Sequence, residues 1–423
     1  MLRKFFILMF FMFAGFNAYA DLNYIDVNKI TKDTNLIADF KYAQLCQPFC
    51  ATWTPQWNEQ ISKEKLIEQL KNIYENFSKL DKNAELFLFL GDIAHFLYNL
   101  DANDEERDFH DMSVANYNNA IALSPQDYRA YWFLGFHCSQ VPGQWLIRGA
   151  KNFQIAETLS PDTKPAEFWA NYANASALTA MPSHYLYAID KAKSILKNVK
   201  QIYTKDKLIE SLDKSSEYDN TDIWRVNKED STNYFISRPL GMRFWLTQKE
   251  GDAFGLQLSG YQKNSGAVVL TPPRLKNSKG VSIGYTILVI AHTVDGKTSL
   301  RDFVKSDSIL VEAKNKTETN FSKKYDKIVS YGIIDKDMYP NIGGAHLHYI
   351  AVERNYPKYA GLALEIPTVP FGTSNAGYYR LTPQPDRFQG KIIYTILLDT
   401  CEDIHEDSLK VFKDFFENRL LIE

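Results

Sequence analysis

The sequence predicts an all-α helical repeat array followed by a separate α+β domain that has a mainly antiparallel sheet and a C-terminal helix. Three observations support this fold class. Apolar residues recur with a 36-residue spacing within residues 62–204, as expected for stacked helical units. From Trp224 onward, short β-rich runs replace the helical period. At 423 residues the chain also exceeds the roughly 100–200 residues of one domain, so two folded units are expected.

Composition and charge restrict the class of partner. Hydrophobic residues make up 45% of the chain and aromatic residues 14%, which is typical of a globular protein and argues against long disorder. The formal net charge is only −3, and no dense block of Lys and Arg is present. Binding to a phosphate backbone depends on such positive charge, so we expect no nucleic-acid partner.

Residues 1–20 have the layout of a secretory signal peptide. Arg3 and Lys4 supply positive charge, Phe5 to Phe13 form the apolar stretch, and Ala18-Tyr19-Ala20 has the small-x-small pattern of a cleavage site. Cleavage after Ala20 would place the mature chain in the periplasm or outside the cell. The alternative is an uncleaved anchor, but the apolar stretch is shorter than the roughly 20 residues that span a bilayer. No later segment is long and apolar enough to span one, so we expect no integral membrane protein after cleavage.

Export bears on the four cysteines, because disulfides persist outside the cytosol. In the N-terminal segment, residues 21–61, the four-residue separation of Cys46 and Cys50 favours a disulfide between them, which leaves Cys138 and Cys401 free or joined to each other. The alternative is four independent thiols. A metal site formed by Cys46 and Cys50 alone would lack two ligands. No motif indicates a cofactor.

Residues 62–204 contain matching half-repeats. Three of them place an Ala three positions after a large apolar residue, and two add a proline: Tyr117-Ala120-Pro125, Phe153-Ala156-Pro161 and Ile189-Ala192. Each follows a half-repeat that begins with an aromatic residue, and two of these contain a Leu-Gly pair: Phe87-Leu90-Gly91, Tyr131-Leu134-Gly135 and Trp169-Tyr172-Ala173. Small residues let two helices approach closely, and a proline ends the second helix, so the pattern predicts helical hairpins. Insertions at Asp101–Asp111 and around Pro142-Gly143 separate the helices of the first two hairpins.

These motifs resemble the tetratricopeptide repeat family over residues 85–200, although the third unit lacks the Gly and the Pro. The resemblance implies that the first helix of each unit lines a concave groove for a protein or peptide partner. The predicted partner-binding residues flank the Leu-Gly positions: Asp92, His95, Arg129, Trp132, Phe136, Ser139, Glu167 and Asn174. The alternative fold is a non-repeating helical bundle. The alternative role of Trp132 and Phe136 is packing against the C-terminal domain.

Two segments flank the predicted repeats. Ser62 is expected to cap a helix whose apolar residues, from Leu66 to Leu80, recur at helical spacing. This helix would cover the open end of the array, because stacked repeats need a terminal cap. Residues 205–223 are polar and predict a linker.

Residues 224–423 predict the α+β domain. Val281 to Ile290 and Lys391 to Leu398 have the continuous apolar pattern of fully buried strands. One helix is expected to start near Ser299, with Asp302 in the capping-box position, and a second helix closes the chain. This order resembles the PsbP-like domains, and the resemblance implies a module for protein association.

The strongest candidate for chemistry in this domain is the pair His346 and His348, followed by Glu353. On a strand the two histidines project from the same face, so both imidazoles can reach one metal ion, and Glu353 can add a carboxylate. The pattern resembles the first metal motif of the cupins, but the glycine spacing and the later histidine of that family are missing. Ordinary strand histidines are the alternative, and we assign no metal site from the sequence.

No catalytic residues are assigned. Neither a Gly-x-Ser-x-Gly elbow nor a His-Glu-x-x-His helix occurs, and no glycine loop for phosphate is present. Cys401 and His405 lie four residues apart, but a disulfide or a buried thiol fits an oxidising compartment better than a nucleophile. The sequence thus predicts an exported interaction or scaffold protein of the periplasm or cell envelope. The alternative is a metal-dependent enzyme or sensor that uses His346 and His348.

The export prediction is tested at the N-terminus. Because Ala18-Tyr19-Ala20 ends the apolar stretch, Edman sequencing of the mature protein should begin at Asp21. Recovery of intact Met1 in a membrane fraction would overturn the prediction.

Overall fold

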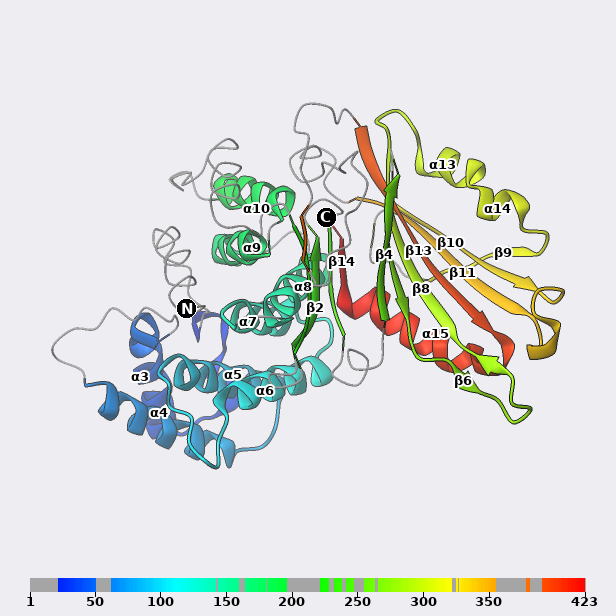
Figure 1. Cartoon of the computed structure of the whole chain (residues 1–423). Coiled ribbons are helices and arrows are strands. Elements are labelled where there is room, and N and C mark those ends of the chain that lie inside the picture. Colours follow the sequence, from blue (N-terminus) through cyan, green and yellow to red (C-terminus); the bar gives the residue numbers. More distant parts are fainter. Residues whose placement is uncertain are drawn as a thin grey trace. The chain divides into compact units, whose positions relative to one another are not determined.

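The computed structural model describes residues 22–50, 62–141, 144–159, 164–179, 181–195, 221–227, 232–237, 241–246, 255–262, 265–321, 325, 327–354, 378–380 and 390–422. The chain divides into two compact units, residues 1–178 with 188–202 and residues 179–187 with 203–423 (Figure 1). The first unit is helical and the second contains the strands, which confirms a helical region followed by an α+β domain. The predicted signal peptide lies outside the described residues. In the described part of the chain, no helix is both long and apolar enough to cross a membrane.

The helical unit begins in the N-terminal segment, for which the sequence patterns predicted no element. Its elements are η1 (Leu22–Tyr24), α2 (Val27–Ile30), α3 (Thr34–Cys50), α4 (Lys63–Ser78), α5 (Ala84–Asn99), α6 (Phe109–Leu123), α7 (Tyr128–Ser139), α8 (Gln144–Leu159), α9 (Ala166–Leu178) and α10 (Pro182–Ile195). The expected cap of α4 is confirmed, because the Ser62 hydroxyl accepts a hydrogen bond from the N–H of Lys65 at 3.2 Å. Asn83, Asp108 and Asp127 cap α5, α6 and α7 in the same way.

Glycine brings the two helices of the first two hairpins together. A Cβ added at Gly91 of α5 would lie 2.5 Å from the ring of Tyr117 on α6. A Cβ at Gly135 of α7 would lie 3.1 Å from the ring of Phe153 on α8. The same kind of contact, a glycine on the first helix against an aromatic ring on the second, thus occurs in both hairpins. It confirms that these small residues permit close helix packing.

The two helices of each hairpin are separated by loops of different length. Residues 100–108 separate α5 from α6, whereas residues 140–143 separate α7 from α8. Helix α6 ends at Leu123, two residues before Pro125, as predicted. The alanines of the repeat pattern, Ala120, Ala156 and Ala192, are all buried. Helix α9 packs against both α7 and α8, so it extends the helical layer.

The second unit is built from two main sheets. Its strands are β1 (Thr221–Asn227), β2 (Thr232–Ser237), β3 (Met242–Trp245), β4 (Gly255–Gln262), β5 (Ser265–Thr271), β6 (Leu275–Lys276), β7 (Ser282–Ile283), β8 (Tyr285–Asp295), β9 (Lys316–Glu318), β10 (Ile328–Asp335), β11 (Ala345–Glu353), β12 (Tyr378–Arg380), β13 (Gly390–Cys401) and β14 (Leu420–Ile422). The larger sheet has the order β4-β5-β8-β13-β11-β10-β9, the smaller one the order β12-β1-β2-β3-β14, and β6 pairs with β7. Every pairing is antiparallel, as predicted.

Helices cover both faces of the larger sheet, which explains why β13 is apolar along its length (Figure 1). On one face, Tyr394 and Ile396 join a core that includes Phe412 of α15 (His405–Asp414) and the smaller sheet. On the other face, Ile393 and Leu397 pack in a core with α13 (Leu300–Ser306) and α14 (Ser308–Glu312). A strand with both faces covered carries no polar alternation, so the prediction of a fully buried strand is confirmed for β13. It is wrong for Val281 to Ile290, which is divided between β7 and β8 and alternates between buried and partly exposed residues.

Helix α13 lies where the sequence placed it, and the last α-helix, α15, is present. The prediction that this helix closes the chain is wrong: a π-helical turn, Phe415–Arg419, follows it, and Leu420 begins β14, which pairs with β3. Ser299 accepts a hydrogen bond from the N–H of Asp302 at 3.1 Å, and its hydroxyl donates to the Asp302 carboxylate at 2.6 Å. One boundary differs: β1 begins at Thr221, inside the predicted linker 205–223, because this end of β1 pairs with β12 and β2.

The close approach at Gly91 gives a stability prediction. Tyr117 cannot move aside easily, because it is fully buried and its hydroxyl donates to Asp92 at 2.5 Å. Gly91→Ala should therefore lower the free energy of unfolding by about 1–3 kcal/mol through overpacking, although alanine has the higher helix propensity. Urea denaturation followed by far-UV circular dichroism measures the change. The control is Gly296→Ala, where a Cβ meets nothing within 4 Å, and equal effects of the two variants would contradict the packing.

Candidate functional site

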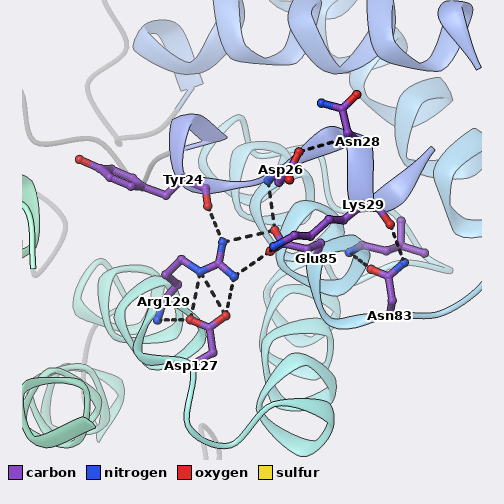
Figure 2. A network of polar contacts seen from close by, with 9 residues as sticks. Tyr24, Asp26, Asn28, Lys29, Asn83, Glu85, Asp127 and Arg129 are labelled. Carbon is purple, nitrogen blue, oxygen red and sulfur yellow. Dashed lines mark hydrogen bonds and ion pairs between the residues drawn. The ribbon is translucent and has the colours of Figure 1, made fainter. Parts of the chain in front are cut away.

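The candidate site is the surface of the helical unit covered by the chain's own N-terminal segment. We call residues Leu22–Ile30 the strap. The strap site consists of Asn83, Glu85, Arg129 and Trp132, which come from the start of α5 and from α7. Figure 2 shows the polar contacts between the strap and this site.

Arg129 is the centre of the polar network. Its Nη2 donates to Glu85 Oε1 at 2.8 Å and to Asp127 Oδ2 at 2.6 Å, and its Nε donates to Asp127 Oδ1 at 3.0 Å. Burial on its own lowers the pKa of Arg129, but the hydrogen bonds that it donates to Asp127 and Glu85 outweigh burial and raise the pKa. The guanidinium is therefore charged and held in place by two carboxylates (Figure 2).

The strap site binds the main chain of the strap at three points (Figure 2). Arg129 Nη1 donates to the carbonyl of Tyr24 at 2.6 Å. Glu85 Oε2 accepts from the N–H of Asp26 at 3.1 Å, and Asn83 Nδ2 donates to the carbonyl of Lys29 at 3.3 Å. The ion pair of Lys29 with Glu85, at 3.6 Å, adds little because the Lys29 side chain is 63% exposed. The site thus recognises a polypeptide backbone through fixed donors and acceptors.

One side chain of the strap is recognised by an aromatic group. The ring of Tyr24 lies 5.1 Å from the ring of Trp132, and its hydroxyl donates to Glu167 Oε2 at 3.2 Å. Trp132 is itself buried among aromatic rings, including that of Phe168 at 5.9 Å. Leu22 and Ile25 of the strap are also buried. The site therefore favours an aromatic residue flanked by apolar residues.

The structure brings together some of the predicted partner-binding residues. Arg129, Trp132 and Glu167 all contact Tyr24 of the strap. Asn174 lies half-buried on α9. The sequence analysis missed Asn83, Glu85 and Asp127. Their positions could have been recognised from the sequence, because Asn and Asp are typical residues immediately before a helix and Glu is typical of its first turn.

Four other predicted partner-binding residues do not line an open groove. Asp92, His95, Phe136 and Ser139 are at most 3% exposed, as is Trp132, so none of the five is open to an external partner while the strap is in place. Asp92 instead accepts the hydroxyl hydrogen bond of Tyr117 from the neighbouring helix. The reason is geometric: the positions that follow the Leu-Gly pair face the second helix and the adjacent hairpin.

His95 belongs to a buried chain of three histidines. Its Nδ1 lies 2.8 Å from Nδ1 of His137, and Nε2 of His137 lies 2.8 Å from Nδ1 of His110. Asn99 Nδ2 is a donor, since it also bonds the carbonyl of Cys50, and it lies 3.2 Å from Nε2 of His95. His95 Nε2 must therefore accept, and each ring in turn donates to the next: His95 to His137 and His137 to His110. Each of the three rings is neutral in this arrangement.

The predicted disulfide is not formed in the structure. Cys46 and Cys50 are free, buried thiols on α3, and Cys138 and Cys401 are free and buried as well. Cys50 Sγ instead donates to the carbonyl of Cys46 at 3.0 Å, as a thiol at the end of a helical turn can. Burial raises the pKa of Cys46 and of Cys50, so both thiols stay protonated.

The histidines of the second unit form a separate cluster. His346 and His348 lie on one face of β11, as predicted, and His405 of α15 stacks on both, with ring centroids 4.0 Å and 5.1 Å away. Glu402 bonds His346. Burial, followed by the charges of His405 and His346, lowers the pKa of His348 to about 4.

Glu353 does not belong to the His346 and His348 cluster, which corrects the predicted ligand set. It lies at the other end of β11, where Lys327 at 2.7 Å and Lys391 at 3.1 Å pair with it. A strand rises by more than 3 Å per residue, so five residues place Glu353 far from His348. Among the residues that the structure describes, no group of three His, Cys, Asp or Glu side chains has an arrangement that could hold a metal ion.

Comparison with known proteins adds no relative: no family model, no curated protein and no solved structure matches the chain.

The histidine chain predicts acid sensitivity of the helical unit. Burial lowers the pKa of His137 far below its usual 6.5 and lowers the pKa of His110. Below pH 6.5 the unfolded chain binds protons that the folded chain does not, so stability falls with decreasing pH until the folded pKa is reached, by up to about 1.4 kcal/mol per pH unit for each group. Urea denaturation from pH 7.5 to 5.0 should show a shallower slope for His137→Gln than for the wild type. Identical slopes would count against a neutral chain.

Proposed function

We propose that the chain is an exported interaction or scaffold protein of the periplasm or cell envelope, whose helical unit binds a protein or peptide partner. The signal-like residues 1–20 support the location. The repeated glycine contacts of Gly91 and Gly135 support a tetratricopeptide-type array, in which hairpins stack in register.

The observation that carries the proposal is the recognition of the strap by its main chain. Arg129, Glu85 and Asn83 bind two carbonyls and one N–H, and Trp132 receives a tyrosine ring. Main-chain hydrogen bonds give affinity for a polypeptide segment, here one with a 3-10 turn and a short helix, and contact with one large side chain gives direction and specificity. These contacts within one chain support a polypeptide-binding role for the helical unit.

Electrostatics of the site fit a polypeptide ligand. Glu85, Asp127 and Arg129 together carry two negative charges and one positive charge, and the guanidinium remains available to a carbonyl oxygen through Nη1. A polypeptide backbone offers carbonyl and N–H groups in alternation, which matches a donor beside an acceptor. Proteins commonly use such arginine and aromatic residues as anchors in interfaces.

Site-directed photocrosslinking in cells tests the proposal. A photoreactive amino acid replaces Lys82, an exposed residue next to Asn83, in the full-length chain. Irradiation of the envelope fraction should give an adduct with a second polypeptide, detected by a mass shift on a gel and identified by mass spectrometry. The control replaces Lys410, an exposed residue of α15. Absence of an adduct at Lys82, or an identical adduct from Lys410, would contradict the proposed partner-binding role of the helical unit.

A further inference from the structure

The strap site is organised independently of the strap. The guanidinium of Arg129 is fixed by Asp127 and Glu85, and none of those contacts involves the strap. Asp127 is in turn fixed because it caps α7 through the N–H of Arg129 at 3.0 Å. Removal of the strap therefore leaves Nη1 of Arg129 aimed at the same position. A site that is pre-organised in this way loses little conformational entropy when a new segment binds.

The strap is also recognised by features that other segments can supply. The three polar contacts are made with main-chain groups of Tyr24, Asp26 and Lys29, which any residue type except proline provides at the N–H position. Among the strap side chains, the Tyr24 ring and the apolar Leu22 and Ile25 are the ones that pack against the helical unit, while Asn23 and Lys29 make exposed polar contacts with Gln44 and Glu85. The requirement is an apolar residue, then any residue, then an aromatic residue and a second apolar residue.

The position of the strap in the chain allows it to leave. The non-helical residues 31–33 join it to α3, so the strap can move away while α3 stays in place. Its departure breaks hydrogen bonds and exposes the buried Leu22 and Ile25. It leaves the caps of α5 and α7 intact, because these are made by Asn83 and Asp127 with their own helices.

We propose that the strap is a resident occupant of a receptor site, and that an external polypeptide segment with an apolar-x-aromatic-apolar pattern binds there by displacing it. This inference rests on the proposed function, since it names the class of partner. The strap competes from the same chain at an effective concentration on the order of millimolar, as is usual for a short tether. An external segment therefore binds the native chain weakly unless it exceeds the affinity of the strap.

Fluorescence anisotropy with a labelled peptide of residues 22–32 tests the exchange. The full-length strap variant Tyr24→Ala/Ile25→Ser should bind this peptide at least tenfold more tightly than the wild type, because its own strap competes less. In the same background, Arg129→Ala should weaken binding at least tenfold. Arg107→Ala is the matched control, since Arg107 also pairs with two carboxylates, Asp104 at 3.0 Å and Glu75 at 3.2 Å, but is not part of the strap site. Its effect should stay within twofold.

Several outcomes would overturn the inference. One is equal peptide affinity in the wild type and a folded strap variant; another is equal effects of Arg129→Ala and Arg107→Ala. Circular dichroism shows whether the strap variant folds. If it does not, hydrogen exchange is measured on the wild type, where excess peptide should increase exchange of the amides of residues 22–30; unchanged exchange then rejects displacement.

The outcome separates this inference from the proposed function. If the Lys82 crosslink forms equally well with Arg129→Ala, the partner binds outside the strap site, so the inference fails while the interaction role stands. If the peptide binds as expected but no Lys82 adduct forms in cells, the site has the stated chemistry and the interaction role fails.

Discussion

The shared guanidinium of Arg129 is the contact on which the organisation of the helical unit depends. It joins Asp127, the cap of α7, to Glu85 in the first turn of α5, and it holds the strap through the carbonyl of Tyr24. A charge that is partly removed from water needs partners for its hydrogen bonds: the two carboxylates hold the guanidinium in place, and the strap carbonyl accepts from its Nη1. The same requirement fixes the relative positions of two hairpins and a polypeptide segment. Stability and recognition therefore share one set of atoms.

Sequence patterns predicted the structure correctly where residue size, helix capping or burial of a whole strand determines it. Gly91 and Gly135 were recognised because only small residues permit close helix packing, and Ser299 because its hydroxyl caps a helix with Asp302 in place. The uninterrupted apolar run of β13 followed from the helices that cover both faces of the sheet. In each case the residue type reflects a cap within one helical turn, the small size that two neighbouring helices need, or the burial of a whole element.

Sequence patterns did not predict the features that depend on contacts between residues far apart in the chain. The strap has no periodic pattern, because its structure comes from partners more than 50 residues away, such as Glu85 and Arg129. The histidines at 95, 110 and 137 are polar residues at positions that proved to be interior, and only their mutual hydrogen bonds make that burial acceptable. His405 joined His346 and His348 because a strand and a helix far apart in sequence meet. Glu353, by contrast, is close to these histidines in sequence but is separated from them by the length of the strand.

The place of β13 in the larger sheet has a consequence for the order of assembly. This strand lies between β8 and β11, and both faces of the sheet rely on its side chains, yet it is among the last segments of the chain. Until residues 390–401 are synthesised, β8 and β11 have no common neighbour and their apolar edges stay unpaired. The larger sheet is then two separate three-stranded pieces, β4-β5-β8 and β11-β10-β9, which need protection from association with other chains. The smaller sheet is completed later still, when β14 pairs with β3.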